Sequence, residues 1–135
     1  MATITAQLKL DSAAGSLLTS VLAIDDTATL TKLGTTDGLE DTTGLARKTF
    51  AAATETQLLA AASYTDTKAH KLYIKNTDTG SSTQVEITLG TAGGSKSLGF
   101  LDPDDWAFMP WQGTEDINVK CTSATTQVEW MLIFE

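Results

Sequence analysis

The sequence predicts an all-β protein: an antiparallel β-sandwich, jelly-roll-like, with an N-terminal strand or arm and at most one short helix. Apolar side chains recur at every second position in several segments. This spacing is typical of strands, because successive side chains of a strand point to opposite faces. Clusters of Gly, Asn, Asp, Ser and Thr separate the segments and mark turns between short strands. No self-similar period is present, so a solenoid or a propeller is not expected.

Length and charge limit the classes of function. The chain has 135 residues, of which 41% are hydrophobic, enough to bury one core without disulfides or metals. Asp and Glu number 17 against 9 Lys and Arg, and the net charge of −8 would repel a phosphate backbone, so we expect no nucleic-acid partner. We also expect no membrane partner and no secretion signal, because the sequence has neither a run of about eighteen apolar residues nor a basic-then-apolar start.

The first strand is expected over residues 3–10, as a sheet edge or as an arm. Its second face is polar, as a half-buried antiparallel strand requires, and its first face carries Ile4, Ala6, Leu8 and Leu10. Residues 16–33 mix Leu, Val and Ile with Thr, and we interpret them as a hairpin that turns at Asp25 and Asp26.

A polar run punctuated by glycine occupies residues 34–44. It offers no face to bury, and we interpret it as a linker. The chain therefore divides into residues 1–44, an N-terminal arm or β-hairpin region plus linker, and residues 45–135, the body of the β-sandwich.

Residues 54–62 allow two interpretations. Thr54 is placed to cap a short helix, with Gln57 reaching back to it in a capping box. The alternative takes residues 50–53 and 57–60 as short strands, since capping-box patterns also arise by chance.

Two hairpins are expected in the body. The first joins residues 71–75 to 84–89 through a loop of turn-forming residues. The second joins residues 116–121 to 128–134. The last strand carries apolar residues on its other face too, which predicts that a neighbour or a second sheet covers both of its sides; these residues are Met131 and Ile133.

No catalytic, cofactor or metal site is expected. The one histidine, His70, precedes a strand, where a surface or loop-tethering residue is more usual than a general base. The one cysteine, Cys121, lies on the apolar phase of a strand and is expected to be a buried, inert thiol. One His and one Cys cannot supply a zinc site. The glycines of residues 90–94 lack the GK[ST] ending of a phosphate loop and are expected in a hairpin loop.

Three acids around a proline, Asp102, Asp104 and Asp105, offer oxygen ligands that suit calcium. Their spacing does not match the twelve-residue calcium loop, so an acidic turn is the favoured interpretation and cation binding stays an alternative. Carboxylate pairs of the kind that cleave glycosides also stay an alternative, but the sequence does not locate one.

The aromatic segment at residues 106–111 holds two of the three tryptophans. Alternation places Trp106 and Phe108 on one face and Met109 and Trp111 on the other, so one set fills the core while the other covers a neighbour. Burial of both sets in the core is the alternative. With the first strand, this segment supplies the interface candidates Ile4, Leu8, Leu10, Trp106, Phe108, Met109 and Trp111.

The body contains, in order, Lys71-Leu72-Tyr73-Ile74-Lys75-Asn76, Leu98-Gly99-Phe100-Leu101-Asp102-Pro103-Asp104-Asp105-Trp106, Pro110-Trp111, Ile117-Asn118-Val119-Lys120 and Val128-Glu129-Trp130-Met131-Leu132. This order of strands, acidic proline turn and aromatic-proline step resembles small β-sandwich virion proteins of tailed bacteriophages. Among these are capsid cement or decoration proteins and tail accessory proteins. The resemblance covers about residues 45–135.

The resemblance implies a non-enzymatic structural protein of the virion, a homo-oligomer with a trimer as one option. Its expected partner is the major capsid protein or another virion protein, and its expected location is the capsid surface or the tail. A cement protein binding the outer shell is the first expectation; a tail accessory or receptor-binding protein, with its aromatics stacking on a glycan, is the alternative. In either case a free edge of the strand at residues 3–10 is expected to add to a neighbouring subunit's sheet.

Overall fold

The computed structural model describes residues 4–12, 23–66, 68–80 and 83–135. These residues form eleven strands and one 3-10 helix, and no helix among them is long and apolar enough to cross a membrane. The elements are β1 (Ile4–Asp11), β2 (Ala23–Leu30), β3 (Asp41–Thr42), β4 (Ala46–Phe50), β5 (Glu55–Leu59), η1 (Ala61–Ser63), β6 (His70–Asn76), β7 (Val85–Leu89), β8 (Lys96–Leu101), β9 (Trp106–Trp111), β10 (Ile117–Cys121) and β11 (Thr126–Phe134).

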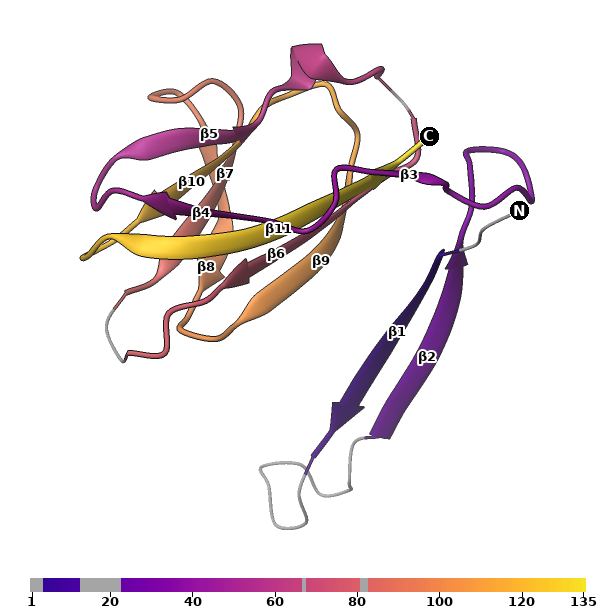
Figure 1. Cartoon of the computed structure of the whole chain (residues 1–135), viewed down its shortest axis with the longest axis horizontal. Helices are drawn as coiled ribbons and strands as arrows, with labels where there is room; N and C mark the ends of the chain where they lie inside the picture. The colour runs from indigo at the N-terminus through magenta and orange to yellow at the C-terminus, as the bar shows by residue number, and fades with distance from the viewer. Residues whose placement is uncertain (1–3, 13–22, 67, 81–82) are drawn as a thin grey trace.

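Strands β3 to β11 build an antiparallel β-sandwich (Figure 1). One sheet has the order β5-β10-β7-β8; in the other, β4 and then β3 pair along one side of β11, followed by β6 and β9. The pairs are nested: β4 with β11, β5 with β10, β6 with β9 and β7 with β8. This is a long hairpin rolled into two layers, which is the jelly roll, and it confirms the predicted fold class.

Both predicted hairpins of the body are wrong in their pairing. Strands β6 and β7 follow each other in sequence but lie in opposite sheets, and so do β10 and β11. The alternation of apolar residues defines which face of a strand is buried, but it does not define which strand lies beside it. Only the loop at residues 90–95 closes a hairpin as expected, between β7 and β8.

The core lies between the two sheets. Alternate residues of β6 are buried, as the period of two requires, and Cys121 of β10 is fully buried as predicted. Burial raises the pKa of the Cys121 thiol. The buried apolar members of the core are Phe50, Leu59, Leu72, Ile74, Val85, Ile87, Leu101, Trp111, Ile117, Val119, Cys121, Val128 and Leu132.

Residues 55–59 are strand β5, so the strand interpretation is correct there and the capping-box helix is not. Strand β5 pairs with β10, and the side chain of Glu55 reaches Thr88 of β7 and the loop that follows this strand. Its carboxylate accepts hydrogen bonds from the hydroxyls of Thr88 and Ser95 and from the backbone N–H of Gly93. These donors, led by Ser95, lower the pKa of Glu55 to about 2.

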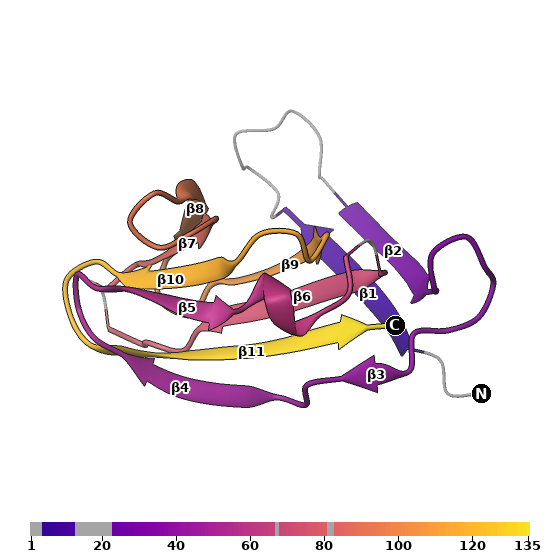
Figure 2. The ribbon, with the colours of Figure 1, turned by 90° about the horizontal axis from the view of Figure 1, so that it is seen from above.

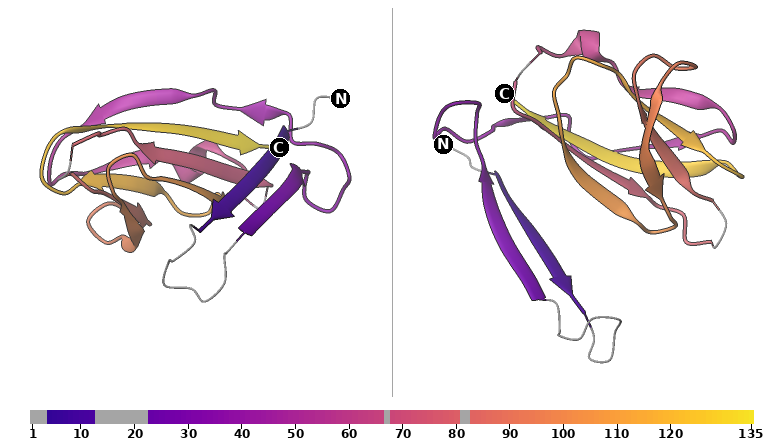
Figure 3. Two further views of the ribbon diagram at one scale, coloured as in Figure 1. Left: turned by 90° about the horizontal axis from the view of Figure 1, so that it is seen from below. Right: turned by 180° about the vertical axis from the view of Figure 1, so that it is seen from behind.

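Strands β1 and β2 form a separate two-stranded ribbon, called here the arm (Figures 1 and 3). Its eight cross-strand pairs place Asp25 and Asp26 in the middle of β2, opposite Lys9 and Leu8. The predicted turn at these acids is therefore wrong, because the full-length ladder with β1 satisfies more main-chain groups than a local turn. Residues 16–22 of that predicted hairpin lie outside the described residues.

The predicted linker at residues 34–44 is also structured in part. Leu39 is fully buried, its N–H donates to the carbonyl of Leu30 at 2.9 Å, and residues 41–42 pair with β11. The segment thus fastens the arm to the body instead of separating the two, because its one leucine finds an apolar site beside the last strand.

Candidate docking groove

One face of the arm is apolar along most of its length. Residues directly opposite each other on paired strands lie on the same face of a ribbon. The register therefore places on this face four cross-strand pairs: Ile4 with Leu30, Ala6 with Ala28, Leu8 with Asp26, and Leu10 with Ile24. Asp26 is the one charged residue on it. The other face carries Thr, Gln, Lys and Asp side chains.

The base of the arm packs on the outer face of the sheet that contains β11. Leu30, Leu39 and Ile133 form a small buried cluster there, 5%, 0% and 2% exposed. Ile4 and Met131 pack against it. The expectation that something covers the second face of the last strand is confirmed, and the cover is the chain's own N-terminal part. Figure 2 shows the arm crossing close to the C-terminal end of β11.

The far half of the arm is different, because its apolar residues face solvent. Leu8, Leu10 and Ile24 are 42%, 43% and 39% exposed. A contiguous apolar patch of this kind on a charged protein marks an interaction surface more often than an isolated exposed leucine does. Ile24 was not among the predicted interface residues; the alternation of Ile24, Ala28 and Leu30 was the available signal, and Asp26 interrupts it.

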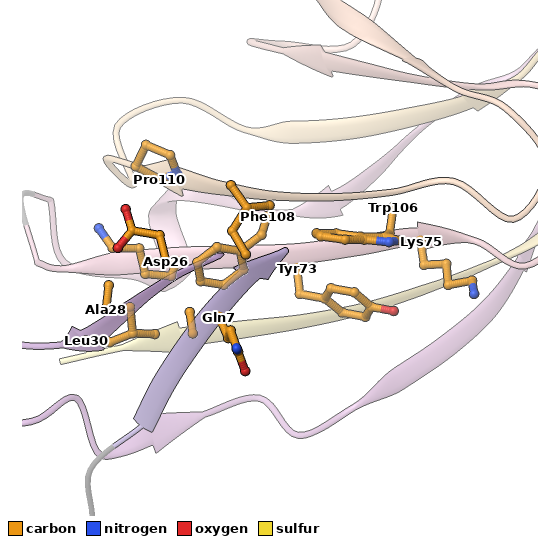
Figure 4. A pocket seen from close by; sticks show the side chains of 12 residues that line it. Gln7, Asp26, Ala28, Leu30, Tyr73, Lys75, Trp106, Phe108 and Pro110 are labelled. Atoms are coloured by element: carbon orange, nitrogen blue, oxygen red, sulfur yellow. The ribbon is translucent and has the colours of Figure 1, made fainter. Parts of the chain in front are cut away.

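Opposite the arm lies a ladder of side chains on the outer face of β6 and β9, called here the aromatic wall (Figure 4). Its three cross-strand pairs are Lys71 with Pro110, Tyr73 with Phe108, and Lys75 with Trp106. Trp106 is 52% exposed and Phe108 38% exposed. The wall thus presents aromatic rings between two lysines.

The arm and the aromatic wall line a groove of about 820 Å³. The arm contributes mainly its apolar face, including Leu8, Asp26 and Leu30. A mostly apolar cleft with a few charged groups is the usual composition of a binding site.

Hydrogen bonds hold the polar ends of the wall in place. The Tyr73 hydroxyl donates to Glu129 at 3.1 Å, and the Arg47 Nε donates to the other oxygen of Glu129 at 2.5 Å. The bond from Arg47 lowers the pKa of the Glu129 carboxyl. The pKa of the Tyr73 hydroxyl is raised, mainly by burial and in addition by its hydrogen bond to Glu129. Lys75 pairs with Asp104 at 2.6 Å, and that bond raises the pKa of Lys75.

The structure separates the interface candidates into two groups. Leu8, Trp106 and Phe108 line the groove and are exposed, and Leu10 is exposed on the same face of the arm as Leu8. Ile4 is partly buried at the base of the arm. Trp111 belongs to the core and the partly buried Met109 packs against it, as the predicted alternation requires. The Trp111 indole N–H donates to the carbonyl of Glu115 at 2.9 Å.

His70 was expected to be a surface or a loop-tethering residue, and its burial shows that the surface alternative is wrong. It is 2% exposed and lies among aromatic rings, with centroids 5.3 Å from Trp111 and 5.9 Å from Tyr64. Its Nδ1 has no hydrogen-bond partner among the described residues, and burial lowers its pKa. The ring therefore acts as a core residue.

The acidic proline segment forms a turn. The N–H of Asp105 donates to the carbonyl of Asp102 at 2.9 Å, and the Asp104 carboxylate forms an ion pair with Lys75. Within the described ranges, no group of three His, Cys, Asp or Glu side chains is arranged to hold a metal ion. These contacts account for the three acids as turn residues.

Comparison of the chain with protein-family models, with curated proteins and with solved structures gives no match. What the described residues define is a class of architecture: a jelly-roll sandwich of a four-stranded and a five-stranded sheet, with a two-stranded amphipathic arm.

Proposed function

We propose that this protein is a non-enzymatic structural component of a virion, a capsid cement or decoration protein that binds the outer shell as an oligomer. The observation that carries the proposal is the arm, whose base packs on the body while its apolar residues Leu8, Leu10 and Ile24 remain exposed. An exposed apolar ribbon gains stability when another protein covers it.

Three further observations support the proposal. Jelly rolls are a common architecture of viral capsid proteins, although they also occur in lectins. Two polar side chains of the wall are held by the chain's own acids, since Lys75 binds Asp104 and Tyr73 binds Glu129. The resemblance of residues 45–135 to phage virion proteins agrees with this role.

Quantitative mass spectrometry of purified phage particles tests the proposal. We expect a copy number in fixed ratio to the major capsid protein, and we expect particles lacking the protein to release their genome at a lower temperature. Absence of the protein from purified particles would contradict a structural role.

A second candidate, a tail protein that binds a cell-surface glycan, is favoured by Trp106. Its half-exposed indole lies beside the Lys75–Asp104 pair, which offers hydrogen-bonding groups next to a stacking surface. A low copy number per particle, with glycan binding that the Trp106→Ala variant loses and the Leu98→Ala variant keeps, would favour this candidate. Leu98 is an equally exposed residue of the other sheet.

A further inference from the structure

We propose that the arm of one subunit docks on the aromatic wall of a second copy of this chain. The inference rests on the proposed function, because it names the partner of the arm within the oligomer. It starts from two apolar surfaces of one chain that stay open: the far half of the arm, and the part of the wall around Trp106.

The two surfaces match in spacing. Leu8 and Leu10 are two residues apart on one strand, and Trp106 and Phe108 are two residues apart on another. In each case the side chains leave the same face about 6.8 Å apart. This spacing is common to all strands, and it permits the side chains of two ribbons to interdigitate face to face, as they do between the layers of a sandwich.

The structure of the wall favours an arm that docks on the outer face of β6 and β9 over an arm that pairs as an extra strand with the edge of β9. Strand β9 lies at the end of its sheet and contains Pro110, which has no N–H to donate to an added strand. A docked arm would instead cover the rings of Trp106 and Phe108. This differs from the strand addition that the sequence suggested.

The two surfaces also match in charge. Asp26 is the one charge on the apolar face of the arm, while the wall carries Lys71 and Lys75 beside its rings. Lys71 makes no ion pair with any described residue. Two copies that each carry a net charge of −8 repel each other in general, so a self-contact is favoured where opposite signs face each other. The arm and the wall meet this condition.

Sedimentation of the full-length chain over a range of concentrations tests the contact. We expect the wild-type chain to self-associate, and the single variants Asp26→Lys and Lys71→Asp to weaken association at least about tenfold, because each places like charges together. Matched controls make the same charge changes elsewhere. Asp25→Lys lies on the polar face of the arm and Lys96→Asp lies on the other sheet, and both should leave association within about twofold of wild type.

Mixing the two single variants separates a contact between copies from a contact within one copy. In a mixed pair, the arm of the Asp26→Lys variant meets the wall of the Lys71→Asp variant, and the unchanged arm meets the unchanged wall. Opposite charges then face each other at both contacts, so the mixture should associate more strongly than either variant alone. A contact of the arm with its own wall would be repaired in the double variant but not in the mixture.

Three results would overturn the inference: a wild-type chain that stays monomeric up to about 0.1 mM, single variants that associate as the controls do, or single variants that the mixture fails to rescue. A chain that passes this test but is missing from particles would contradict the virion role and leave the contact between copies intact.

Discussion

The side-chain amide of Asn76, in the sheet of β6, donates a hydrogen bond to the main-chain carbonyl of Leu101 in the opposite sheet, over 3.1 Å. The same amide donates to the carbonyl of Thr83 at 2.8 Å, and its oxygen accepts from the N–H of Asp78 at 3.0 Å. Asn76 is fully buried. One polar side chain therefore ties the two layers together where the chain crosses between them.

Replacing this residue should destabilise the sandwich. The Asn76→Ala variant removes the buried donor and leaves a cavity, which we expect to lower the free energy of unfolding by about 2–4 kcal/mol. Urea denaturation measures the change, with Gln127→Ala, at an exposed position on the neighbouring strand, as the control. Equal stability of the two variants would show that the amide does not hold the layers together.

Gly113 is expected to tolerate no side chain. Its φ is +81°, and a Cβ there would lie 3.0 Å from Cε1 of the buried His70. Gly113→Ala should therefore cost both backbone strain and displacement of the ring, about 2–4 kcal/mol in all.

Gly93 provides the matched control for that substitution. Its φ is +86°, but no atom lies within 4 Å of the added Cβ, so Gly93→Ala costs only the strain, about 1 kcal/mol. Thermal unfolding of the two variants measures the difference. Similar losses in both would mean that the ring of His70 moves aside freely.

The buried His70 predicts a loss of stability in mild acid. Because burial lowers its pKa below the usual 6.5, the folded chain stays neutral at this residue while the unfolded chain gains a proton. Between the folded pKa and pH 6.5 the unfolded state binds more protons, so the free energy of unfolding falls as the pH falls and levels off above about 6.5.

The melting temperature measured from pH 5 to pH 8 checks this dependence. The His70→Phe variant keeps an aromatic ring in the cluster and should show a flatter profile in this range, whatever its absolute stability. An unchanged slope in the variant would assign the pH dependence to other groups.

Removing the arm should leave a folded body that no longer assembles. The main core draws its buried residues from Phe50 onward, and deletion of residues 1–37 spares Leu39 and β3. We expect circular dichroism to keep its β-sheet spectrum, with a modest loss of stability because Ile133 loses the cover of Leu30. Binding of the truncated chain to intact particles would contradict a role for the arm in assembly.

The local rhythm of apolar residues made some parts of the structure predictable. It indicated an all-β chain, a first strand with one apolar face, and the opposite directions of Trp106 and Trp111 in β9. These features follow from a period of two, which a strand imposes on neighbouring residues. The sequence therefore allowed the prediction of two exposed residues of the arm, Leu8 and Leu10, and of the exposed rings of the wall.

Strand partners were not predictable in this way. In the jelly roll β4 pairs with β11 and β6 with β9, across long stretches of chain. The alternation of apolar residues is a local pattern, so it does not indicate which distant strand lies beside a given strand. The expected hairpins between neighbours in sequence failed for this reason. The burial of His70 and Leu39 was missed because both residues owe their burial to segments far away in the chain.

The amino-acid sequence by itself determined that this chain forms strands, and which side of the first strand and of β9 is apolar, because those properties depend on adjacent residues. Only the tertiary structure decided that the arm stands beside the aromatic wall, with Asp26 and Lys71 lining one groove. That arrangement depends on register and on layer packing, which the chain establishes only when its distant parts meet.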